Sequence, residues 1–158
     1  MLETTHALIA GTIAIHTKDP AAAITLSFLS HFLLDAVPHW DLGSNWRKRR
    51  KLYTGVAAII DVIVGFGLGY LMFGTSVPLP LLFAAITASM LPDWMEAPWY
   101  IFFANHQKKE PAKQAGFFEK LTFWIYKIEN KFHNKTGFLF GIITQIVAVG
   151  FFWLLLKP

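Results

Sequence analysis

Long apolar segments separated by short polar breaks dominate this chain. Two of them, residues 53–74 and 137–156, contain the roughly 20 apolar residues that a membrane-crossing helix needs. Three further apolar segments cover residues 2–17, 20–37 and 80–90. The pattern predicts an all-α membrane helical bundle with about five membrane segments. The first two are short for spanning and favour a tight hairpin.

Proline residues mark the predicted ends of several helices. Pro20 follows Lys18-Asp19 and suits the first turn of a helix. Pro38 is expected to end or kink the second segment, because proline lacks the backbone N–H that a helix interior uses. For the same reason the fourth segment is expected to break at Pro92, and an aromatic-rich stretch continues over residues 93–104.

The strongly polar region of the chain covers residues 105–135. Within it, residues 117–132 interleave lysine and glutamate with aromatic side chains, which is typical of an interfacial amphipathic helix lying on a membrane surface. We therefore predict one integral-membrane domain over residues 1–158, with a polar cytoplasmic segment at about 105–135.

Composition agrees with a membrane protein. Hydrophobic residues make up 54% of the chain and charged residues 15%, whereas charged residues average about 25% in soluble proteins. The alternative is a soluble helical protein with an unusually apolar core. The chain has no cysteine, so disulfides and thiolate metal sites are excluded.

Positive charge is concentrated in two regions. All lysines and arginines except Lys18 and Lys157 lie within residues 47–51 and 108–135. Threading five membrane segments places both regions on one side, which the positive-inside rule makes cytoplasmic. We expect a multi-pass protein of the inner membrane, with its N-terminus inside and its C-terminus outside. Membrane lipid is the expected partner, and no nucleic acid is needed to explain the basic residues.

Potential metal ligands gather where the second apolar segment ends. His31 and Asp35 are four residues apart, so they share one face of a helix. Beyond Pro38 the chain is redirected, and it carries His39 and Asp41. Ionisable side chains next to a segment that is apolar enough to enter a membrane are costly, so they mark candidate functional sites.

The predicted topology brings further polar residues to the same side of the membrane: His6, Asp61, Asp93, Glu96 and His133. Imidazole nitrogen and carboxylate oxygen bind Zn²⁺, Mn²⁺ or Fe²⁺. We expect a divalent-metal centre, most consistent with Zn²⁺, and enough ligands for two ions. The expected ligands are His6, His31, Asp35, His39, Asp93 and His133.

Several candidates also have a structural interpretation. His31 and Asp35 are alternatively a hydrogen-bonded pair that holds two helices together. Asp61 is alternatively an ion relay or a partner of a ligand, and Glu96 is alternatively exposed to water. His16 and His106 lie away from the predicted site.

The short motifs of this site resemble a known family. Thr5-His6, His31-x3-Asp35, Pro38-His39-x-Asp41 and Leu91-Pro92-Asp93 are similar to motifs of small bacterial and archaeal membrane proteins. These are described as membrane-bound metal-dependent hydrolases (the LexA-binding, inner-membrane-associated group), distantly related to zinc-dependent phospholipase C. The resemblance implies an all-helical fold, a hydrolase activity and metal-site positions at His6, His31, Asp35, His39 and Asp93.

The leading expectation is therefore a membrane-embedded metal-dependent hydrolase. It would cleave a phosphoester or related bond of a lipid-borne substrate with a metal-activated water. Asp35, Asp41 or Asp61 would accept the proton from that water. The anionic headgroup of the substrate is expected at three basic residues: Arg47, Arg49 and Arg50.

Two other classes of function stay open. One is a metal or proton transporter or sensor, which would need a path to the outer face; beyond Asp61 the third segment has no further acid or base. The other is a structural membrane subunit. Gly65 and Gly69 form a small-residue face that allows close helix approach, so an oligomer through this face is possible.

Overall fold

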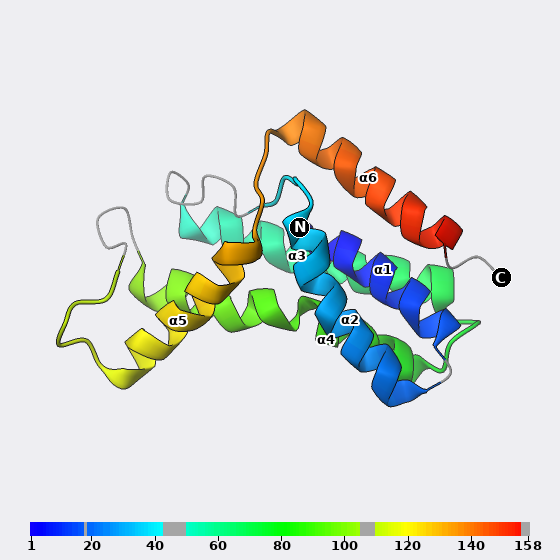
Figure 1. The fold of residues 1–158 in the computed structure, drawn as a ribbon, viewed down its shortest axis with the longest axis horizontal. Coiled ribbons are helices and arrows are strands. Elements are labelled where there is room, and N and C mark those ends of the chain that lie inside the picture. Colours follow the sequence, from blue (N-terminus) through cyan, green and yellow to red (C-terminus); the bar gives the residue numbers. More distant parts are fainter. Residues whose placement is uncertain (18, 43–49, 105–109, 156–158) are drawn as a thin grey trace.

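The computed structural model describes residues 1–17, 19–42, 50–104 and 110–155. Over these ranges the chain is all-α, as predicted, with α-helices and one short π-helix and no β-strand (Figure 1). The helices are α1 (Glu3–His16), α2 (Pro20–Ala36), α3 (Lys51–Phe73), α4 (Leu79–Pro98), η2 (Trp99–Phe103), α5 (Phe117–Phe132) and α6 (Phe138–Leu155).

Helix α1 lies in the middle of the bundle. It contacts α2, α3, α4 and α6 (Figure 1). Small side chains such as Ala7, Ala10 and Ala14 are buried around it, and a helix that is apolar on all sides is stable when other helices surround it. The first predicted segment is therefore an internal helix, joined to α2 through Asp19, whose carboxylate caps the N-terminus of α2.

The small-residue face of α3 is used within the chain. Gly65 and Gly69 are both buried. A Cβ atom at Gly65 would lie 2.9 Å from Met90 Cε and 3.2 Å from Ala7 Cβ, and one at Gly69 would lie 2.6 Å from Ile86 Cδ1. These glycines let α3 approach α1 and α4 closely, so this face is already covered.

Helix α4 does not break where the sequence predicts. It continues through Pro92 to Pro98, and the π-helix η2 follows. Pro92 is fully buried. A proline inside a helix removes one backbone hydrogen bond at a cost of roughly 3 kcal/mol, and tight packing of the surrounding helices offsets this cost. The prediction of a break at Pro92 was wrong.

Two helices are long and apolar enough to cross a membrane, namely α3 and α6. About five membrane segments were predicted, so this number is corrected. Helices α1 and α2 are too short, and α4 is not among the helices that are both long and apolar enough. The apolar side chains of α3 and α6 are mostly exposed, including Leu71 and Leu139. Exposed apolar surface of this extent marks an interaction surface, and a bilayer is one environment that covers it.

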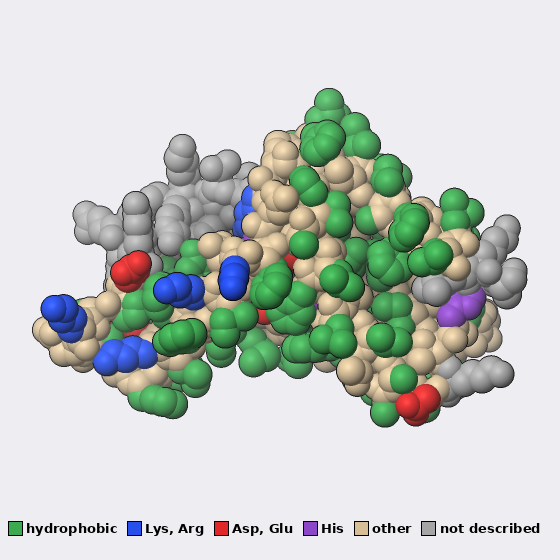
Figure 2. Space-filling view, in the orientation of Figure 1, with side chains coloured by type: hydrophobic (Ala, Val, Ile, Leu, Met, Phe, Trp, Pro, Cys, Tyr) green, Lys and Arg blue, Asp and Glu red, His purple; other side chains and the backbone are tan. Residues whose placement is uncertain are grey.

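Helix α5 has the bounds that the sequence predicts, and it is amphipathic. Its exposed apolar side chains follow helical spacing: Phe117, Leu121, Trp124, Ile128 and Phe132. Figure 2 shows lysine and hydrophobic side chains next to each other over this helix. Its buried residues, Thr122 and Glu129, belong to the side that packs against α2, α4 and η2.

Candidate metal centre

The ends of several helices meet beside the start of α1 and bring together all six expected metal ligands. They form two groups, and within each group the ligand atoms lie within 4.8 Å of one another. One group is His6, Asp93 and His31; the other is Asp35, His39 and His133.

Backbone hydrogen bonds explain how His133 reaches α2. The N–H of Asn134 donates to the carbonyl of Asp35 at 2.9 Å, and the N–H of His39 donates to the carbonyl of Asn134 at 2.9 Å. The N–H of Thr136 completes the ladder by donating to the carbonyl of His39 at 2.8 Å. The segment after α5 is thus fixed alongside the end of α2.

Asp35 is the centre of the site. Its side chain is 1% exposed, and four imidazoles face its carboxylate. Their Nε2 atoms lie 3.3 Å (His6), 3.5 Å (His31), 3.8 Å (His39) and 2.8 Å (His133) from the nearer carboxylate oxygen. The terminal ammonium of Met1 also pairs with Asp35 Oδ1. One carboxylate is therefore shared by both groups of ligands.

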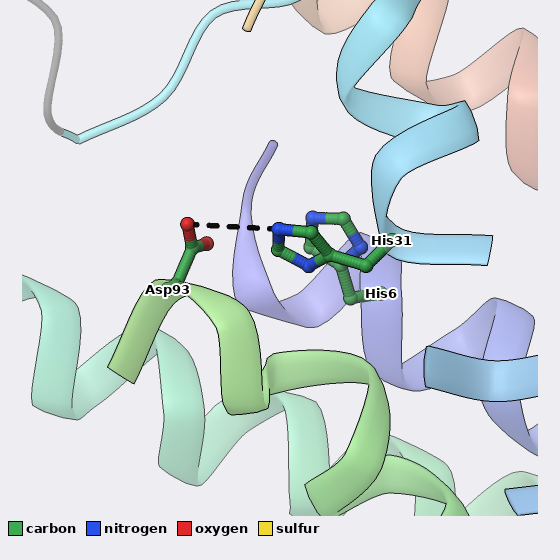
Figure 3. Close-up of side chains that lie close together, drawn as sticks. All are labelled: His6, His31 and Asp93. Carbon is green, nitrogen blue, oxygen red and sulfur yellow. Dashed lines mark ion pairs between the residues drawn. The ribbon is translucent and has the colours of Figure 1, made fainter. Parts of the chain in front are cut away.

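The first group combines three helices. His6 of α1 and His31 of α2 stack with ring centroids 4.3 Å apart, and Asp93 of α4 points toward His31 (Figure 3). His31 Nε2 lies 3.8 Å from Asp93 Oδ1 and 3.5 Å from Glu129 Oε2. Glu129 of α5 thus adds a second buried carboxylate to this group.

The second group extends to Asp41. Its Oδ2 lies 3.7 Å from Nε2 of both His39 and His133, and 2.9 Å from Lys135 Nζ. Burial by itself raises the pKa of Asp41, but the contacts with His39 and Lys135 outweigh this and hold the pKa well below its usual range. Asp41 is therefore ionised at neutral pH.

In two of the histidines, the hydrogen bond of Nδ1 determines the protonation of Nε2, the nitrogen that faces Asp35. His31 Nδ1 lies 2.8 Å from the carbonyl oxygen of Ser89, and His39 Nδ1 lies 2.8 Å from that of Val37. A carbonyl oxygen only accepts, so both Nδ1 atoms carry the proton. In the neutral ring Nε2 then carries no proton, and its lone pair is available to a metal ion. This is the arrangement found in metal-bound histidines.

The buried ligand atoms lack other partners. His6 Nε2, His31 Nε2 and His39 Nε2 have no hydrogen bond within the described part of the chain, and all three side chains are fully buried. Buried polar atoms are nearly always satisfied in folded proteins. Lone pairs of imidazole facing carboxylate oxygens repel one another unless a proton or a cation lies between them.

The distances fit a divalent cation. Zinc bonds of about 2.1 Å in tetrahedral geometry place ligand atoms about 3.4 Å apart. Around Asp35 the separations of 3.3 Å and 3.5 Å are close to this value, that of His39 is 3.8 Å, and that of His133 is shorter, at 2.8 Å. Direct hydrogen bonds are shorter, at about 2.7–3.2 Å. The donor set could therefore hold a metal ion, with His133 and Asp35 also at direct hydrogen-bond distance.

Other predicted residues lie elsewhere. Asp61 accepts hydrogen bonds from the N–H of Glu3 at 2.7 Å and from the hydroxyl of Thr4 at 2.6 Å, so it caps the start of α1 and belongs to neither ligand group. Arg50 is exposed, with its guanidinium 5.8 Å from the ring of Tyr53.

Some predictions cannot be compared with the fold. Arg47, Arg49 and His106 lie outside the described residues.

Two other predictions can be compared with the fold. Glu96 is buried at 7% exposure, so the alternative of a water-facing side chain does not hold for it. His16 is exposed at the far end of α1, away from the ligands, as expected.

Sequence reasoning missed Glu129 and Lys135. Both lie in the polar region, whose charged residues were interpreted as contacts with the membrane surface and as the signal for membrane orientation. The signal for Glu129 is weak: it lies outside the apolar stripe that contains Trp124 and Ile128, where an acidic side chain is expected to be solvated. Its contact with His31 depends on how α5 packs against α2.

Comparison with protein-family models, curated proteins and solved structures gives no match to this chain. The class of site is therefore defined by its own geometry: a largely buried cluster of four histidines and several carboxylates that could hold a metal ion.

Proposed function

We propose that this protein is an integral-membrane, metal-dependent hydrolase that cleaves a phosphoester or related bond of a lipid-borne substrate. The observation that carries this proposal is the buried Asp35 carboxylate, faced by four histidine Nε2 atoms. Two of these histidines are held in the metal-binding tautomer by backbone carbonyls. Zinc is the favoured ion, with Mn²⁺ or Fe²⁺ as alternatives.

The residues of the centre have different proposed roles. A divalent cation at such a site supplies an activated water and polarises a phosphoryl oxygen. Asp35 joins the two ligand groups, which leaves it unsuited to take a proton. Asp41 lies beside His39 and His133 and lines the adjacent cavity, so it is the preferred proton acceptor. Lys135 holds Asp41 in place and offers its charge to a phosphate oxygen.

The lipid-borne substrate follows from the surroundings of the centre. Helices α3 and α6 expose apolar side chains over much of their length, and α5 carries both lysines and exposed aromatic residues. Such a molecule meets lipids more readily than solutes. We place the basic regions, the N-terminus and the metal centre on the cytoplasmic side of the inner membrane, and the C-terminus outside, by the positive-inside rule. This orientation needs a third crossing, by α4, in addition to those of α3 and α6.

Metal analysis combined with a headgroup-release assay tests this function. His31→Ala and Asp93→Ala are expected to lose bound metal and to reduce phospholipid hydrolysis by about 100-fold or more. Even outer partners of metal ligands contribute roughly 10–100-fold. His16→Ala is the matched control, because His16 is exposed and far from the centre. Purified protein without metal, or hydrolysis unaffected by the two variants, would refute the proposal.

Transport is less well supported than hydrolysis. Beyond the metal centre, the buried core between α1, α3 and α4 includes Ala10, Ala14, Phe73, Val77 and Leu82, which are all apolar. An ion or proton crossing this cluster would meet apolar side chains, which are costly surroundings for a charge. Metal flux into vesicles containing the purified protein would reverse this ranking.

A further inference from the structure

A large cavity lies beside the metal centre. Its volume is about 880 Å³, and its walls are formed by the first half of α3 and by the second half of α4 together with η2. Asp41, Asp93 and His133 line one part of it, so the cavity and the ligand groups are continuous. Cavities of about 300–1,000 Å³ are typical of ligand sites.

Most of the cavity wall is apolar. On α3 the lining side chains recur with helical spacing at Leu52, Val56, Ile59 and Ile63, and they share one face of the helix. This face is about 17 Å long at 1.5 Å per residue. One leaflet of a bilayer has a hydrocarbon depth of about 15 Å, half of the roughly 30 Å core. The apolar wall therefore has the length of one acyl chain.

The cavity is open along α3. Ile59 and Ile63 line it and are also 61% and 65% exposed. They belong to a helix that is long and apolar enough to cross a membrane. An apolar chain can thus pass sideways from the surrounding lipid into the cavity without crossing water.

The two parts of the cavity differ in chemistry, as the headgroup and the acyl chains of a lipid do. The part beside the metal centre carries Lys135, which pairs with Asp41, and the ligand groups that would hold cations. Positive charge there complements a phosphate group. The remaining wall on α3 is mostly apolar, with Lys51, Thr54 and Asp61 as its polar members, and its apolar part complements a hydrocarbon chain.

We propose that this cavity is an acyl-chain site, which receives one chain of a membrane phospholipid laterally between α3 and η2 and holds its phosphate at the metal centre. The inference rests on the proposed function for the reaction, but binding of the chain is a separate property. It makes the substrate a long-chain lipid rather than a free phosphoester.

Filling the cavity tests this site. Gly55 lines the cavity, and a Cβ atom there meets nothing within 4 Å, so Gly55→Phe places a ring in the open space. Gly67 is the matched control: it is on the same helix, exposed, outside the lining, and equally free of contacts. Ala97→Phe fills the cavity from the opposite wall and serves if Gly55→Phe does not fold.

Two readouts separate chain binding from hydrolysis. The first is crosslinking of phosphatidylglycerol with a photoreactive group near the end of its acyl chain, in vesicles containing the protein. We expect label on residues 52–63 of α3, lost in Gly55→Phe and kept in Gly67→Phe. The second is hydrolysis of the long-chain lipid against a short-chain, water-soluble analogue.

Gly55→Phe should lower kcat/KM for the long-chain lipid by about tenfold or more, the scale of a poor fit in an apolar pocket. The short analogue and Gly67→Phe should stay within about twofold of the unchanged protein. Crosslinking that is unchanged in both cavity-filling variants would overturn the acyl-chain site. Site-specific label on a protein whose hydrolysis does not depend on His31 would keep the acyl-chain site and remove the hydrolase.

Discussion

At the scale of single residues, Asp35 determines what the centre can do. It is buried, it faces histidines from both ligand groups, and its own helix supplies His31 one turn earlier. A carboxylate in such a position would help to hold a cation rather than act as a base. Asp61, which the sequence placed beside it as a proton acceptor, instead caps the start of α1.

Replacing these two aspartates should give opposite results. Asp35→Asn is expected to reduce bound zinc at both ligand groups, because the amide is a weaker and uncharged ligand. Asp61→Ala should keep its zinc and lower the free energy of unfolding by about 1–3 kcal/mol, since buried N–H groups of α1 lose their acceptor. Elemental analysis and thermal unfolding in detergent measure both effects. Loss of zinc in Asp61→Ala would contradict this assignment.

Glu129 gives a second prediction at this scale. Its Oε2 lies 3.5 Å from His31 Nε2, so Glu129→Gln should weaken zinc binding by about 10–100-fold. Glu110→Gln makes the same chemical change at an exposed position and should leave the affinity unchanged. Competition with a chromophoric zinc chelator measures the affinity of each variant. Equal affinities for the two variants would remove Glu129 from the centre.

At the scale of helices, close packing around α1 holds the ligands in register. Gly65 brings α3 against α1 and Met90 of α4, and α6 reaches back with Gln145, whose Oε1 accepts from the N–H of Leu2 at 2.9 Å and the hydroxyl of Thr5 at 3.1 Å. The position of His6 depends on these contacts, because it lies one residue beyond Thr5.

Enlarging one glycine should loosen this packing. Gly65→Leu is expected to destabilise the protein by about 1–3 kcal/mol, since overpacking forces neighbouring side chains to shift. Gly67→Leu adds the same side chain where a Cβ atom has open space and should stay within about 0.5 kcal/mol. Denaturation followed by circular dichroism compares the two. A Gly65→Leu protein as stable as Gly67→Leu would show that α3 does not need this close approach.

The sequence predicts the helices better than it predicts their environment. The bounds of α5 and the end of α2 at Pro38 follow from amphipathic spacing and from proline chemistry, which are local. The course of α4 through Pro92 depends on burial among other helices. The six expected ligands could be picked out from the sequence because each belongs to a short local motif or ends a segment, and the structure brings them together in two groups. Glu129 was missed because its partner His31 lies on another helix.

At the scale of the whole molecule, the main question is how the bundle lies in a membrane. Two helices, α3 and α6, are apolar and long enough to cross one, whereas α1 is enclosed by its neighbours and has little surface for lipid. The described lysines gather on α5 and beside it, including Lys113, Lys120 and Lys127. This asymmetry supports the proposed orientation with α5 on the cytoplasmic side.

The absence of cysteine makes this orientation easy to test. Ser76, in the turn between α3 and α4, and Glu110, before α5, are both exposed. A membrane-impermeant maleimide added to intact spheroplasts should label Ser76→Cys and should label Glu110→Cys only after the membrane is opened. Labelling of both variants from the same side would exclude a return of the chain across the membrane through α4, which lies between the two positions.

The enclosed position of α1 has a consequence for biosynthesis. The ribosome makes α1 before α6, whose Gln145 binds the start of α1. Until α6 is made, α1 has only part of its final surroundings, and His6 has no complete set of neighbours. Binding of metal at the centre is therefore expected to follow the synthesis and packing of α6.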